Sequence, residues 1–135
     1  ESMRLGGDVL YLAQCALNTG RAVYVDRSFY NYLQRSSSGC HLPDLARKQD
    51  NIRAYRMVQR SLEEHNVDPL VMDFIKRILV YHSSYMAELA YELKDGNVLK
   101  ESLELMREYE KEYRMLNANR TEWIRRFEEI LQYKI

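Results

Sequence analysis

The chain has 135 residues, of which 46% are apolar, and its 20 Lys and Arg balance 20 Asp and Glu to a formal net charge of zero. A chain of this length and composition can bury one core, whereas disordered chains are poor in apolar residues and strongly charged. The even charge excludes the basic surface typical of nucleic-acid-binding proteins, and we expect no nucleic-acid partner. No apolar run approaches the ~18 residues of a membrane span, so we expect no transmembrane segment.

The first predicted helix begins at Asp8 and ends near Gly20. Asp8 suits the N-cap position because its carboxylate can accept hydrogen bonds from the unpaired N–H groups of a first helical turn. Gly20 suits the left-handed position that ends many helices. Between them one apolar stripe repeats at helical spacing: Val9, Leu12, Ala13, Ala16 and Leu17.

Two short β-strands are predicted next, over residues 21–26 and 28–33. Both segments are rich in β-branched and aromatic residues, which favour strands. Residues 36–39 read Ser-Ser-Ser-Gly and predict a loop, which Pro43 closes.

The rest of the chain predicts four amphipathic helices, over residues 44–64, 68–95, 97–116 and 121–131. Asp68-Pro69 is a strong start signal, since Asp caps a helix and Pro fits its first position. Asn97 and Thr121 are the predicted caps of the last two helices. The predicted fold is therefore mainly α: an N-terminal helix and two strands in residues 1–43, then a bundle-like array of four helices in residues 44–135.

Residues 7–38 carry a recognisable pattern. It reads Gly7-Asp8-Val9-Leu10-Tyr11-Leu12, then Val23-Tyr24-Val25-Asp26, then Phe29-Tyr30-Asn31-Tyr32-Leu33-Gln34-Arg35, then Ser36-Ser37-Ser38. In order and spacing this resembles the end of the catalytic domain of bacterial family 2 glycosyltransferases, which are inverting enzymes of the GT-A type. The helices that follow resemble the variable helical tail of that family.

The resemblance implies a role for each matching residue. Asp8 would be the general base for the acceptor hydroxyl. The residues that would bind substrate are Tyr30, Tyr32, Arg35 and Ser38, with the Arg side chain suited to donor phosphates because its planar fork of N–H groups matches phosphate oxygens. From the residues alone, Asp8 is better explained as a plain N-cap, and the Tyr and Arg side chains as an ordinary strand surface; with the resemblance, the two interpretations of Asp8 stand level.

The donor-binding half of such an enzyme has no counterpart in this sequence. No Asp-x-Asp motif occurs, and Mg²⁺ or Mn²⁺ needs carboxylates of that kind. We therefore interpret the chain, which begins Glu1-Ser2-Met3, as a C-terminal piece of a longer enzyme. It is expected to be inactive alone and without a cofactor of its own, whereas the parent would use Mg²⁺ or Mn²⁺, a nucleotide sugar and a glycan acceptor.

Two cysteines are too few for a disulfide framework and favour a cytoplasmic location. The resemblance implies that the parent enzyme acts at the inner face of the membrane. Cys40 and His41 do not complete a zinc site, and His82 lies on an apolar stripe and is interpreted as a core histidine. The apolar residues of the N-terminal segment would lack the sheet they need, so we expect a homodimer in which residues 8–33 make most of the contact. The competing interpretation of the whole chain is a non-catalytic helical protein-interaction module.

Overall fold

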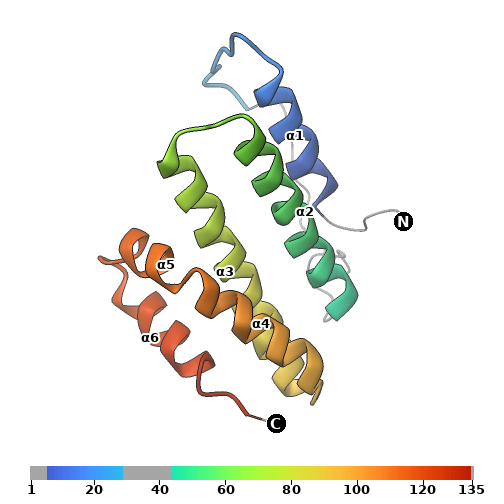
Figure 1. Ribbon diagram of the computed structural model, residues 1–135, viewed down its shortest axis with the longest axis vertical. Helices are drawn as coiled ribbons and strands as arrows, with labels where there is room; N and C mark the ends of the chain where they lie inside the picture. Colours follow the sequence, from blue (N-terminus) through green and yellow to red (C-terminus); the bar gives the residue numbers. More distant parts are fainter. Residues whose placement is uncertain (1–5, 29–43, 135) are drawn as a thin grey trace.

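The computed structural model describes residues 6–28 and 44–134, and these parts contain helices but no strand (Figure 1). The helices are α1 (Gly7–Leu17), α2 (Leu45–Glu64), α3 (Pro69–Glu92), α4 (Gly96–Glu108), α5 (Glu110–Leu116) and α6 (Thr121–Ile130). None of the helices in the described parts is both long enough and apolar enough to cross a bilayer.

The prediction of two β-strands is wrong for the part of it that the structure describes. Residues 21–26 form neither strand nor helix and are exposed along their whole length, with Val23 and Tyr24 80% and 87% exposed. A β-rich composition produces a strand only where a neighbouring strand supplies hydrogen bonds and a packing face, and the described residues supply none. Of the second predicted strand, residues 29–33 lie outside the described residues.

Three helix starts depend on an Asp side chain. Asp44 and Asp68 cap α2 and α3 as predicted, accepting hydrogen bonds from the backbone N–H groups of Arg47 at 3.3 Å and Leu70 at 2.7 Å. The predicted cap at Asn97 is wrong, because Asp95 caps α4 instead and accepts from the backbone N–H of Val98 at 3.1 Å.

The single helix predicted over residues 97–116 is two helices, α4 and α5. Tyr109 lies between them with φ −118° and ψ 24°, outside the helical range, and its side chain is buried. The predicted cap of the last helix, Thr121, is wrong by one residue. Arg120 is the N-cap of α6, and Thr121 is its first helical residue.

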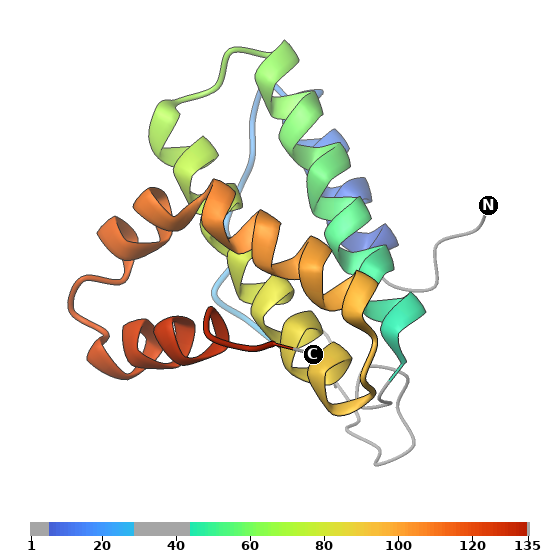
Figure 2. The same cartoon turned by 60° about the horizontal axis from the view of Figure 1, so that its bottom comes forward.

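Helix α3 is the centre of the core. It lies antiparallel to both α2 and α4 in Figure 1, and it also contacts α5 and α6. Its fully buried residues include Leu79, Val80 and the small residues Ala87 and Ala90, which let neighbouring helices approach closely. Figure 2 shows α6 folding back toward the C-terminal half of α3, where α6 contributes the buried Phe127 and Ile130.

Helix α1 packs on α2 and runs in the same direction (Figure 1). Its start is fixed at Gly6, which is buried and has φ +84°. A Cβ atom on Gly6 would lie 2.6 Å from the Cβ of Ala54, too close for any side chain. The side chains that face the core are consequently Val9, Leu10, Ala13 and Leu17, whereas the predicted stripe members Leu12 and Ala16 are exposed.

We expect Gly6→Ala to lower the free energy of unfolding by about 1–3 kcal/mol, because Ala is strained at positive φ and its Cβ would strike Ala54. Urea denaturation followed by circular dichroism measures the effect. Gly7→Ala is the matched control, since a Cβ atom at this helical residue would meet no side chain or neighbouring element within 4 Å. Equal losses in the two variants would contradict the role given to Gly6.

Candidate functional site

Asp8, the predicted general base, lies in the exposed first turn of α1. It is the second residue of the helix and not its N-cap, a position that Gly6 occupies without any side-chain hydrogen bond. One carboxylate oxygen of Asp8 accepts a hydrogen bond from the backbone N–H of Val9 at 2.9 Å. A negative charge is stabilised at this place by the N-terminal end of the helix dipole.

The predicted substrate-binding residues Tyr30, Tyr32, Arg35 and Ser38 lie outside the described residues, as do Cys40 and His41. Asp8 is therefore the one predicted site residue whose surroundings are described. Within the described residues, no group of three or more His, Cys, Asp or Glu side chains is arranged to hold a metal ion.

The negative charge of Asp8 acts on Tyr55 of α2, which pairs with an aromatic side chain of α3. Burial, and then the negative charge of Asp8, raise the pKa of Tyr55 on α2. The Tyr55 ring stacks on the imidazole of His82 on α3, with ring centroids 5.1 Å apart and planes inclined by 26°. The apolar pattern of the sequence does not reveal this pairing, which depends on how α2 and α3 pack.

His82 is half-buried, as its place on an apolar stripe indicates. Burial, assisted by the positive charge of Lys48, lowers the pKa of His82 to about 4. The imidazole is therefore neutral at physiological pH and serves as a packing surface for Tyr55.

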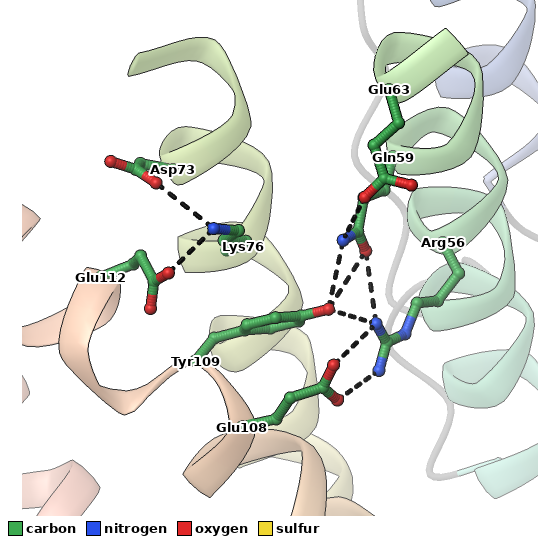
Figure 3. A network of polar contacts seen from close by, with 8 residues as sticks. All are labelled: Arg56, Gln59, Glu63, Asp73, Lys76, Glu108, Tyr109 and Glu112. Carbon is green, nitrogen blue, oxygen red and sulfur yellow. Dashed lines mark hydrogen bonds and ion pairs between the residues drawn. The ribbon is translucent and has the colours of Figure 1, made fainter. Parts of the chain in front are cut away.

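A second group of polar side chains surrounds Tyr109 where α4 ends (Figure 3). The Tyr109 hydroxyl accepts hydrogen bonds from the guanidinium of Arg56 and from the side-chain amide of Gln59, the latter at 3.1 Å. Arg56 also binds Glu108 through Nη2 and Oε2 at 2.7 Å, which lowers the pKa of Glu108. These contacts join α2 to the break between α4 and α5.

Lys76 of α3 holds the other side of the same break. Its Nζ lies 2.8 Å from Oε1 of Glu112 on α5 and 3.5 Å from Oδ1 of Asp73. The hydrogen bond from Lys76 lowers the pKa of Glu112. The Cζ atom of Arg56 lies 5.2 Å from the centroid of the Tyr109 ring, and the Nζ atom of Lys76 lies 5.9 Å from it. Two cations therefore flank one aromatic side chain. The arrangement is a structural clamp on a helix break.

Aromatic and arginine side chains alternate along the contact between α3 and α6. Trp123 stacks on Tyr81 with centroids 5.7 Å apart, and Tyr81 meets the edge of Tyr85 at 5.0 Å. The guanidinium of Arg126 lies 4.3 Å from the centre of the Tyr85 ring and forms a two-bond ion pair with Glu88. Hydrogen bonds from Tyr81 and Arg126 lower the pKa of Tyr85.

A pocket of about 210 Å³ opens beside these rings, with Tyr113, Phe127, Ser84 and Glu122 completing its lining. Its size suits a small group more than a whole substrate. The tyrosines of residues 85–113 differ in burial: Tyr109 and Tyr113 are buried, whereas Tyr85 and Tyr91 are exposed.

No protein-family model, no curated protein and no solved structure matches this chain.

We expect Tyr109→Phe to lower the free energy of unfolding by about 1–3 kcal/mol, because Arg56 and Gln59 lose a shared acceptor in a mostly buried site. Tyr113→Phe is the matched control. Tyr113 is equally buried, but its hydroxyl forms no hydrogen bond with any residue that the structure describes. Urea unfolding of both variants tests the clamp, and a Tyr113→Phe variant as unstable as Tyr109→Phe would refute it.

His82 is expected to make stability fall as the pH drops from about 6.5 toward about 4. In this window the unfolded chain binds a proton at residue 82 that the folded chain does not, so protonation favours unfolding by at most about 3 kcal/mol. His82→Phe keeps an aromatic ring against Tyr55 and removes this contribution. Unfolding free energies measured at several pH values should therefore decline less steeply for His82→Phe than for the natural chain, and parallel curves would contradict the assignment.

Proposed function

We propose that the chain is the C-terminal part of an inverting glycosyltransferase, in which Asp8 is the general base. The observation that carries the proposal is the exposed face of α1. Asp8, Tyr11 and Leu12 share this face by their spacing of three and four residues, and all three are exposed. A carboxylate beside exposed apolar side chains is suited to a cleft completed by another domain.

The chemistry asked of Asp8 is a single proton transfer. Its carboxylate takes the proton of the acceptor hydroxyl while the hydroxyl oxygen bonds to the anomeric carbon of the sugar. The bond from that carbon to the nucleotide diphosphate breaks, and the diphosphate takes the electron pair of this bond. It leaves from the face of the sugar opposite to the attacking oxygen. The configuration at the anomeric carbon is thereby inverted.

The nucleotide sugar, the glycan acceptor and Mg²⁺ or Mn²⁺ would be bound by the complete enzyme, which we place in the cytoplasm at the inner face of the membrane. Tyr30, Tyr32, Arg35 and Ser38 keep their proposed place near the substrate. For the isolated chain we propose a homodimer through residues 8–33. Support comes from the apolar side chains that this segment leaves in water, among them Tyr11, Leu12, Val23 and Tyr24.

A non-catalytic helical interaction module is the second candidate. It is favoured by the all-helical character of the described residues, whose core is built from α2 to α6 without contribution from a sheet. The two candidates differ in what the coding sequence contains upstream of Glu1. A domain with parallel-strand patterning and an Asp-x-Asp motif supports the enzyme, whereas an unrelated domain or a stop codon supports the module.

In the complete enzyme we expect Asp8→Asn to abolish sugar transfer and to leave donor binding unchanged, because an amide cannot take the proton of the acceptor. Asp68→Asn is the matched control: it makes the same substitution at another exposed helix start, where Asn can still cap α3. Transfer is followed by release of the nucleotide diphosphate, and donor binding by calorimetry. An Asp8→Asn enzyme with turnover close to that of Asp68→Asn would exclude Asp8 as the base.

A further inference from the structure

The beginning of α3 presents large apolar side chains to solvent. Leu70, Val71 and Phe74 are 63%, 42% and 47% exposed. Leu70 and Phe74 lie four residues apart and therefore share one face of the helix, with Val71 at its flank. Asp68 and Pro69 fix the start of the helix, so these side chains are held on a regular helical turn.

Two guanidinium groups continue this surface. Arg77 lies one turn beyond Phe74, with its Cζ 5.7 Å from the centroid of the Phe74 ring and 5.5 Å from that of Trp123. The Cζ of Arg120 lies 4.7 Å from the Trp123 ring. Among the residues that the structure describes, neither Arg77 nor Arg120 has an acidic ion-pair partner.

The contacts around Arg77 give the surface a defined shape. Its Nε donates a hydrogen bond to Oδ1 of the buried Asn117 at 3.0 Å, which ties the turn between α5 and α6 to α3. That turn and the beginning of α3 lie at the same side of the molecule, on the left in Figure 1. Asp73 lies 3.5 Å from Lys76, and Asp68 accepts a hydrogen bond from the backbone N–H of Leu70, whereas Glu122 beside Trp123 is exposed.

We propose that this end of the molecule, formed by Leu70, Val71, Phe74, Arg77, Arg120 and Trp123, docks on an anionic lipid bilayer. Exposed aliphatic and aromatic side chains can enter the boundary between headgroups and acyl chains, where Trp is also favoured. The unpaired guanidinium groups complement lipid phosphates. A protein partner would account for the apolar side chains, but two unpaired cations flanking an indole match a phosphate-bearing surface better.

The inference stands on this surface alone and holds for either candidate function, so its failure would leave both of them untouched.

Trp123 is the only tryptophan of the chain and reports on this surface directly. We expect its fluorescence to shift to shorter wavelength, and the protein to sediment, with vesicles of phosphatidylglycerol and phosphatidylcholine. With vesicles of phosphatidylcholine alone both effects should be weak, and raising the salt concentration should weaken binding to the anionic vesicles.

Two matched pairs of variants locate the contact. Leu70→Gln should lower partitioning onto anionic vesicles about tenfold, whereas Leu93→Gln, at the other end of α3 and 55% exposed, should leave it unchanged. Arg120→Glu should weaken binding more than Arg125→Glu, although both lie on or beside α6 and change the charge equally, because Arg125 is paired with Glu129 at 2.6 Å. Circular dichroism verifies that each variant is folded, and the exposed position of Arg120 keeps the test valid if Leu70→Gln unfolds.

The proposal is overturned if anionic vesicles neither shift the fluorescence nor sediment the protein, or if each variant of a pair loses binding equally. Free inorganic phosphate or glycerol phosphate that shifts the fluorescence as strongly as vesicles would show a soluble anion site instead. A dimer in light scattering that Leu70→Gln converts to a monomer would show that a second copy of the chain covers this surface.

Discussion

The burial of α3 is the constraint on which the described helices depend. Helices α2, α4, α5 and α6 each contact α3, and α1 reaches the core through α2. Small side chains such as Ala87 and Ala90 let the neighbouring helices approach α3 closely. Because the core is close-packed, the position of each neighbouring helix depends on the positions of the others. The polar clamp at Tyr109 and the aromatic and arginine row along α6 are both built on this one helix, from Lys76 and from Tyr81 respectively.

The elements that sequence could predict are those whose cause is local. Asp44 specifies the start of α2, and the Asp68-Pro69 pair specifies the start of α3. Each capping side chain acts on backbone groups no more than three residues away, and the structure contains both helix starts. The break at Tyr109 has a remote cause, since Arg56 and Gln59 lie about fifty residues earlier in the chain. The strand predicted over residues 21–26 failed for a related reason, because β-branched and aromatic residues form a strand only beside a partner.

The candidate site likewise has a part that the sequence could predict and a part that it could not. Asp8 was found from a motif; it is exposed in the first turn of α1, but the N-cap role also considered for it is wrong, because Gly6 is the N-cap. Tyr55 and His82 carried no signal besides apolar spacing, because their stacking, and the effect of Asp8 on Tyr55, arise only when the helices pack together. The outward side chains of α1 were also mispredicted, since the contact of Gly6 with Ala54 sets the rotation of this helix on α2. Periodicity alone therefore showed that α1 has an apolar stripe but placed Leu12 and Ala16 on the wrong side.

The parallel course of α1 and α2 has a consequence for the order in which the chain opens. No residue of α1 is fully buried, and a long connection separates it from the helix on which it packs. Docking α1 therefore closes a large loop for a small gain in buried surface, whereas α2, α4, α5 and α6 each pack directly on α3. Amide hydrogens of α1 should exchange with solvent far sooner than those of α3, through a local opening that leaves the helical core intact. We therefore expect the segment that carries Asp8 to open before the rest of the described helices.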